Sequence, residues 1–134
     1  MSLETRVMFI LTGLDVAPDD ITDSIGIQPT QTWRRGDFLQ KTCLGTKHDG
    51  WCLASRYTND PDLSNQIVHL IDALEPFHER ILRARRKYNL EAEISCVVYL
   101  EGETPIAHFD SNLIGRISRL QVSFDLDIIL LGDD

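Results

Sequence analysis

The sequence lacks most of the features that mark membrane, secreted and disulfide-stabilised proteins. Its apolar runs stay well short of the roughly 20 residues that a membrane-spanning helix needs, and its N-terminus lacks the basic, apolar and small-residue segments of a signal peptide. It has only three cysteines, without the Cys-x-x-Cys spacing of redox and metal sites. This small, odd number of thiols predicts a reduced cytoplasmic protein with no disulfide and no membrane association.

Motifs of catalysis and cofactor binding are also missing. The chain has no Gly-x-Ser-x-Gly elbow, no phosphate-binding loop and no dinucleotide fingerprint. Cys43, His48 and Cys52 have the chemistry of zinc ligands, but Cys96 lies too far along the chain to complete the set. We therefore expect no metal and no cofactor, and an enzyme is the less favoured interpretation.

Basic residues are scarce relative to acidic ones. The chain has 13 lysines and arginines against 21 acids, which gives a formal net charge of −8 over 134 residues. Such a field repels nucleic acid and favours association with a basic protein. The same acidity also keeps a protein in solution without any partner, so both interpretations stay open. The length suits a single domain over residues 1–134.

Hydrophobic periodicity predicts a regular succession of strands and helices. Apolar or alternating segments predict strands over 6–11, 31–35, 51–57, 93–100, 106–109 and 122–131. Helices are expected after Pro18, after Pro61 and after Asp110, which are typical helix-starting residues. Pro76 should break the second helix because its ring clashes one turn back. A turn over 101–104 should join its flanking strands as a hairpin.

This order predicts an α+β fold. We expect a mostly antiparallel sheet of five to six strands with helices on one face, in a ferredoxin-like arrangement. The last strand alternates, so one of its faces should point to the core and the other to solvent. The expected core residues are Val122, Phe124, Leu126, Ile128 and Leu130, and the expected solvent-facing ones are Asp125 and Asp127. An uncovered edge strand of such a sheet would offer a route to a homodimer.

One stretch gathers the residue types that dominate binding sites, namely tryptophan and arginine beside a turn-forming acid. Its candidate ligand- or partner-binding residues are Trp33, Arg34, Arg35, Asp37 and Trp51. The strands of the two tryptophans are joined by one polar connection, 38–50, so we expect them to pair as antiparallel neighbours. Two interpretations stay open: a structural role in closing the sheet, or a binding surface.

A second cluster of charge lies near the end of the predicted helix around 77–88. It consists of Arg80, Arg83, Arg85, Arg86 and Lys87. Basic residues at a helix C-terminus interact favourably with the helix dipole, which is a purely structural explanation. The alternative is a patch that binds an anion or an acidic partner.

Short motifs along the chain carry a family resemblance. They are Asp20-Ile21-Thr22, Ile25-Gly26-Ile27-x-Pro29-Thr30, Trp33-x-x-Gly36-Asp37 and Gly50-Trp51-x-Leu53, then Leu70-x-x-x-Leu74-x-Pro76 and Phe124-x-Leu126-Asp127. With these motifs the chain resembles a family of small bacterial domains, domain of unknown function 4279, over nearly its whole length. The family has no established activity, so the resemblance carries over no catalytic residues. Some similar domains look like immunity proteins encoded beside secreted bacterial toxins.

Two functions are consistent with these observations. The first is a non-catalytic interaction domain, of the immunity type, that binds a basic toxin or another protein through its acidic surface and its arginine–tryptophan rim. The second is a small-molecule or anion-binding regulatory domain, or an unrecognised enzyme. Its pocket would lie around Trp33, Arg35, Asp37 and Trp51. A flat surface would favour the first, and a lined cavity the second.

Overall fold

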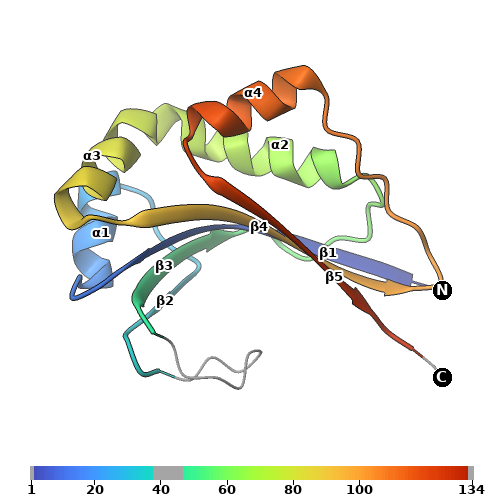
Figure 1. Ribbon diagram of the computed structural model, residues 1–134, viewed down its shortest axis with the longest axis horizontal. Helices are drawn as coiled ribbons and strands as arrows, with labels where there is room; N and C mark the ends of the chain where they lie inside the picture. The colour runs from blue at the N-terminus through green and yellow to red at the C-terminus, as the bar shows by residue number, and fades with distance from the viewer. Residues whose placement is uncertain (1, 38–46, 133–134) are drawn as a thin grey trace. The chain divides into compact units, whose positions relative to one another are not determined.

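The computed structural model describes residues 2–37 and 47–132 and shows an α+β fold. Its strands form one sheet in the order β2-β3-β1-β4-β5, with β2 and β5 at the two edges (Figure 1). In chain order the elements are β1 (Ser2–Gly13), α1 (Pro18–Ile25), β2 (Gln31–Trp33), β3 (Asp49–Ala54), α2 (Leu63–Leu74), η1 (Glu75–Phe77), α3 (His78–Tyr88), β4 (Glu91–Glu101), α4 (Ser111–Arg119) and β5 (Ser123–Leu130). The predicted α+β class is therefore confirmed.

Contacts within the chain gather into two compact units. The first comprises Met1–Phe9, Ala54–Pro76 and Glu93–Asp134, and the second Ile10–Leu53 and Phe77–Ala92. Strands β1 and β4 contribute residues to both units. The single domain over 1–134 stays a prediction.

In the first unit, β4 and β5 pair in parallel, with Glu93 beside Ser123 and Leu100 beside Leu130. The prediction of a mostly antiparallel sheet is therefore wrong, because the sheet is mixed. The expected hairpin does not form: the segment predicted as a strand makes only a single bridge, between Ile106 and Asp62. The chain then enters α4, which returns it to the start of β4, so that β5 runs in the same direction as β4.

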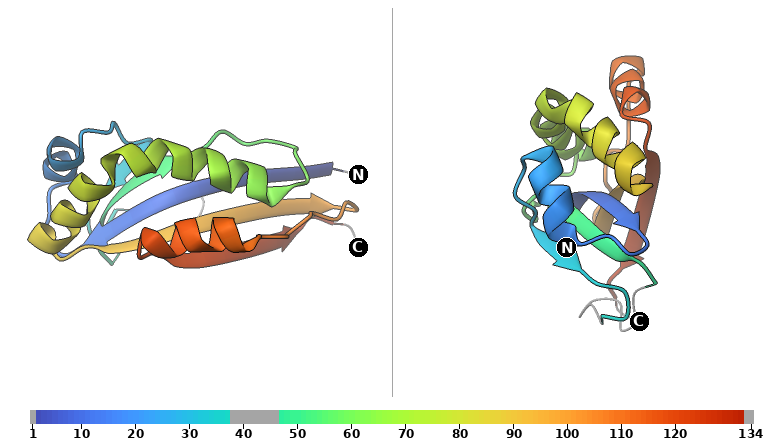
Figure 2. Two further views of the ribbon diagram at one scale, coloured as in Figure 1. Left: turned by 90° about the horizontal axis from the view of Figure 1, so that it is seen from above. Right: turned by 90° about the vertical axis from the view of Figure 1, so that its left-hand side faces the viewer.

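Helices α2 and α4 lie side by side on one face of β4 (Figures 1 and 2). α2 presents a stripe of buried residues, Leu63, Ile67, Leu70, Ile71 and Leu74, at the spacing of one helix face. They are in the same unit as the buried face of β4, which carries Ile94, Cys96 and Val98. α4 buries only Leu113 at its start. The core of this unit is therefore centred under α2.

Strand β5 differs from the prediction. Leu126, Ile128 and Leu130, which were expected in the core, are 38%, 48% and 78% exposed. The prediction was wrong for a physical reason: β5 is an edge strand, and α4, the helix that precedes it, buries only Leu113. Phe124 is the better-covered member, because its ring packs 5.7 Å from that of Phe109.

Pro76 breaks the helical segment as expected. α2 ends at Leu74, a short 3-10 turn carries the proline, and α3 begins at His78. Asp62 caps the start of α2, where its carboxylate accepts hydrogen bonds from the backbone N–H and the hydroxyl of Ser64. Proline has no backbone N–H, so at a break between helices it leaves no donor without an acceptor. This explains why the chain tolerates a proline there.

In the second unit, α1 packs against α3, and β2 pairs with β3 in an antiparallel ladder. α1 ends where Gly26 adopts φ 87°, a left-handed conformation that closes the last turn and costs glycine little. Ile21 and Ile25 of α1 are completely buried, as is Trp51 of β3.

Candidate functional site

The arginine pair lies in a tight turn that follows β2. The backbone N–H of Arg34 donates to the carboxylate of Asp37 at 2.8 Å, and the N–H of Asp37 donates back to the carbonyl of Arg34 at 3.0 Å. Gly36 within this turn has φ 96°, a conformation that disfavours other residues. Asp37 therefore closes the turn in which the two arginines lie.

Behind the turn lies a buried carboxylate that the sequence prediction did not single out. Asp49, at the start of β3, is only 3% exposed. It accepts hydrogen bonds from the backbone N–H groups of Arg35 at 2.8 Å and Val16 at 2.9 Å, and from Nε of Arg34 at 3.1 Å. The one available signal was the position of an acid beside Gly50 at the end of the polar connection.

The environment of Asp49 keeps it ionised. Burial alone would raise the pKa of this carboxyl group, but the two backbone hydrogen bonds and the charge of Arg34 outweigh that effect and lower the pKa below its ordinary value. The carboxylate thus ties together the segment after β1, the turn after β2 and the start of β3.

The two arginine side chains are held to different degrees. Arg34 is fixed through Nε to Asp49, although 58% of its side chain is exposed. Among the described residues, the Arg35 side chain forms one long ion pair of 3.7 Å, with Asp15, and the Arg35 and Asp15 side chains are 59% and 83% exposed. Exposed pairs of this kind contribute little to stability. Of the predicted binding residues, Arg35 is thus the one whose charge remains most available to a ligand.

The tryptophans lie on neighbouring antiparallel strands, as predicted, but on opposite faces. Trp33 is opposite Gly50, and Trp51 is opposite Thr32, so the alternation along a strand points the two rings to opposite sides. The Trp33 ring lies so close over Gly50 that a Cβ there would overlap it. Trp51 has no exposed surface. Its indole N–H donates to the hydroxyl of Thr22 at 3.0 Å.

The structure therefore assembles four of the five predicted residues on or beside one turn and places the fifth in the core. Trp33, Arg34, Arg35 and Asp37 are at least partly accessible. Trp51 takes a structural position instead, because a fully buried ring offers no surface to a ligand. A ligand role for the other four stays a prediction.

A second candidate surface is the β5 edge, which we define by Leu126, Ile128, Leu130 and Leu131. Leu131 is 44% exposed, and Ile114 of α4 in the same unit is 55% exposed. The opposite face of the strand carries Asp125 and Asp127, which lie beside Ser95 and Val97 of β4. Exposed apolar side chains on a strand with an unpaired edge are typical of a binding surface.

The acidic face of this strand is not neutralised. The pKa of Glu93 on β4 is raised, first by burial and then by the neighbouring charge of Asp125. In the described part of the chain, none of Glu93, Asp125 and Asp127 forms an ion pair. Repulsion between unpaired carboxylates favours a positively charged neighbour.

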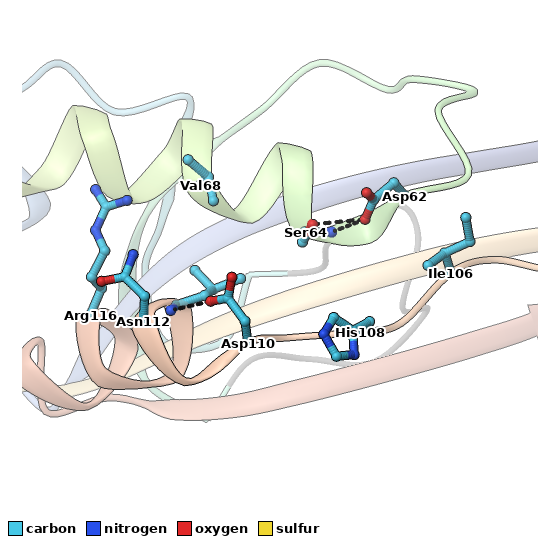
Figure 3. A pocket seen from close by; sticks show the side chains of 9 residues that line it. Asp62, Ser64, Val68, Ile106, His108, Asp110, Asn112 and Arg116 are labelled. Carbon is cyan, nitrogen blue, oxygen red and sulfur yellow. Dashed lines mark hydrogen bonds between the residues drawn. The ribbon is translucent and has the colours of Figure 1, made fainter.

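A small cavity of 240 Å³ lies between α2 and the segment that enters α4 (Figure 3). The two aspartates and the arginine that line it already make contacts within the fold. Asp62 caps α2, Asp110 caps α4 by accepting from the N–H of Leu113 at 2.8 Å, and Arg116 binds Asp72 and Glu75 at 2.6 and 2.7 Å. We therefore assign these residues to helix capping and helix pairing.

The described residues contain no cluster of histidine, cysteine and acidic side chains that would hold a metal ion. Cys52 and Cys96 are buried free thiols. Burial raises the pKa of the Cys96 thiol to about 11, which makes it unreactive at neutral pH. Of the three residues considered as zinc ligands, Cys43 lies outside the described residues and His48 is exposed.

A family model described as Domain of unknown function (DUF4279) matches residues 3–131, nearly the whole chain. The chain belongs to this family. No curated protein and no solved structure matches the DUF4279 chain significantly. No helix among its described residues is long and apolar enough to cross a membrane.

Proposed function

We propose that this DUF4279 domain is a non-catalytic interaction domain of the immunity type, which binds a basic protein such as a toxin along the β5 edge. The observation that carries the proposal is the exposure of Leu126, Ile128 and Leu130 on a strand at the edge of the sheet. An edge strand offers unpaired N–H and C=O groups to which a partner can add a strand of its own. The apolar side chains would then supply the buried contacts.

Charge determines the kind of partner. The chain carries a net charge of −8, and Asp125, Asp127 and Glu93 form an acidic face on β4 and β5 in the same unit as the apolar edge. Opposite charge on a partner would speed its approach and fix its register, because complementary potentials steer encounter. A second copy of this acidic chain would instead bring like charges together, so a homodimer is the less favoured occupant.

The sheet order supports a ferredoxin-like interpretation of the fold. The first four strands occur in the order β2-β3-β1-β4, with β1 and β3 in the middle, as in a split β-α-β arrangement. We infer that α4 and β5 are an addition to that unit. The addition pairs with the edge that β4 would otherwise expose and creates a new edge with its own side chains. That new edge is the proposed binding surface.

The arginine–tryptophan rim of Trp33, Arg34 and Arg35 stays a separate candidate surface with no assigned ligand. The position of Trp51 does not support the predicted pocket around Trp33, Arg35, Asp37 and Trp51, because its ring is completely buried. A cytoplasmic location stays a prediction from the cysteine pattern of the sequence.

The test mixes the purified domain in a calorimeter with the protein that the neighbouring gene encodes, which the proposal expects to be basic. Ile128→Lys places a positive charge in the middle of the β5 edge and should weaken binding at least about tenfold. Leu14→Lys is the matched control, because Leu14 is an equally large apolar residue, is 59% exposed and lies outside the edge. Leu14→Lys should bind as the wild type does.

Two results would contradict the proposal. One is equal affinity of the Ile128→Lys and wild-type proteins for that partner. The other is a stable dimer of the domain alone, abolished by Ile128→Lys, which would show that a second copy occupies the edge. Raising the salt concentration should slow association, since the steering is electrostatic.

A further inference from the structure

Helix α3 carries basic residues whose positions the dipole at its C-terminal end does not explain. Arg85, Arg86 and Lys87 lie in its last turn, where the helix dipole favours them. Arg80 lies in the first turn, where the dipole disfavours a cation, and Arg83 lies mid-helix. The positions 80, 83 and 87 follow the spacing of a single helix face.

This face borders a cavity. Arg80, Arg83 and Lys87 line a space of 260 Å³ together with Ala84 and, from α1, Ser24. No acidic side chain among the described residues lines it. In the part of the chain that the structure describes, none of the three cations forms an ion pair, although the protein has 21 acidic residues.

The three cations differ in how well the fold itself accounts for them. The guanidinium of Arg80 lies against Gly26, within 2.8 Å of where a Cβ would be. There it faces the C-terminal end of α1, which has no basic residue in its last turn. The ammonium group of Lys87 lies 5.3 Å from the ring centre of Tyr88. For Arg83 the described part of the chain supplies no such contact, so a variant at Arg83 distinguishes a structural role from a binding role.

We propose that this cavity binds a small phosphate-bearing anion. Guanidinium groups bind phosphate oxygens through paired, charge-assisted hydrogen bonds, and an ammonium group adds a further charge. Toward the described residues, the hydroxyl of Ser24 makes one long contact, of 3.5 Å, with the Tyr88 hydroxyl, so it is able to turn toward an anion. The volume of 260 Å³ is just below the usual range of small-molecule sites, which favours a small ligand over a protein segment.

The ligand could be free phosphate or the phosphate group of a small metabolite, and the assay separates these sources. Binding of inorganic phosphate, pyrophosphate and glycerol phosphate is measured by calorimetry, with sodium chloride at matched ionic strength as the blank. We expect saturable binding of at least one of them. The strongest ligand of the three identifies the source.

Variants locate the site. Arg83→Gln should weaken binding about tenfold or more, because it removes the paired hydrogen bonds and a charge. Arg83→Lys should recover only part of the loss, since it restores the charge without the paired geometry. Arg86→Gln is the matched control: Arg86 is exposed on the same helix and does not line the cavity. It should leave binding unchanged, and circular dichroism checks that each variant is folded.

Three outcomes would overturn the proposal. The first is no saturable binding of any phosphate compound by the wild-type protein. The second is equal weakening by Arg86→Gln and Arg83→Gln, which would indicate attraction to the overall charge of the helix. The third is an oligoglutamate peptide that binds as tightly as pyrophosphate, which would assign the surface to an acidic protein. Each outcome leaves the β5 proposal intact, because that proposal rests on different residues.

Discussion

The buried carboxylate of Asp49 makes a stringent test of how the arginine turn is held. Asp49→Ala removes the acceptor of two backbone N–H groups, those of Val16 and Arg35, at a position only 3% exposed. A buried donor left without an acceptor costs about 1–3 kcal/mol. Arg34 regains water when it is released, because its side chain is 58% exposed. We therefore expect the free energy of unfolding to fall by about 3 kcal/mol.

Urea denaturation followed by tryptophan fluorescence measures this loss. Asp37→Ala is the matched control, because it removes a carboxylate from the same turn at an exposed position, and it should cost about 1 kcal/mol or less. If the free energy of unfolding of Asp49→Ala lies within about 0.5 kcal/mol of the wild-type value, the hydrogen bonds to this carboxylate do not hold the turn.

The same carboxylate predicts a dependence of stability on acid pH. Its pKa in the folded protein lies below the ordinary value of 3.8, so the ionised form stabilises the fold at pH values above 3.8. That contribution is lost as the pH falls through the lower, folded-state pKa. Asp49→Asn cannot ionise, so its stability should vary less than that of the wild type between neutral pH and this acid range. Parallel loss in both proteins would refute the assignment.

The remaining predictions concern the core. Trp51→Ala should cost about 3–5 kcal/mol in urea denaturation, as other large-to-small core changes do, and Trp33→Ala clearly less; the reverse order would contradict the burial described above. Cys96 should resist iodoacetamide at pH 8 in the folded protein and react once urea is added, because its pKa is raised to about 11; rapid labelling without urea would refute this. Pro76→Ala should change the free energy of unfolding by about 1 kcal/mol or less, since the helices already stop and restart there; a larger loss in the same denaturation assay would mean that the proline is needed for packing.

Local signals in the sequence were sufficient for much of the fold. Asp110 and Pro18 marked the starts of helices, and Pro76 marked the break between α2 and α3, because capping and the missing proline N–H act within one helical turn. The pairing of the two tryptophan strands also followed from their single connection. The orientation of β5 did not, since a turn signal at 101–104 predicted a hairpin whereas the chain made a helical crossover.

The binding turn was predicted only in part, for a similar reason. The strand predicted over 31–35 included both arginines, but β2 ends at Trp33 and the arginines lie in the turn beyond it. The role of Asp49 could not be predicted, because its partners Val16, Arg34 and Arg35 are distant in sequence and meet only when β3 pairs with β2.

The largest disagreement between prediction and structure concerns what covers the apolar face of β5. Alternation identified which side chains share a face of the strand, but it could not show whether anything covers that face, which depends on strand order. The apolar residues on one face of β5 have the alternation of a strand that packs on a core, and yet Leu130, one of them, is 78% exposed. A strand that needed no cover would tolerate polar residues on both faces, as solvated strands do. The exposed apolar face is therefore the observation behind the proposed contact with another protein, and the net charge of −8 is the reason that the proposal names a basic partner.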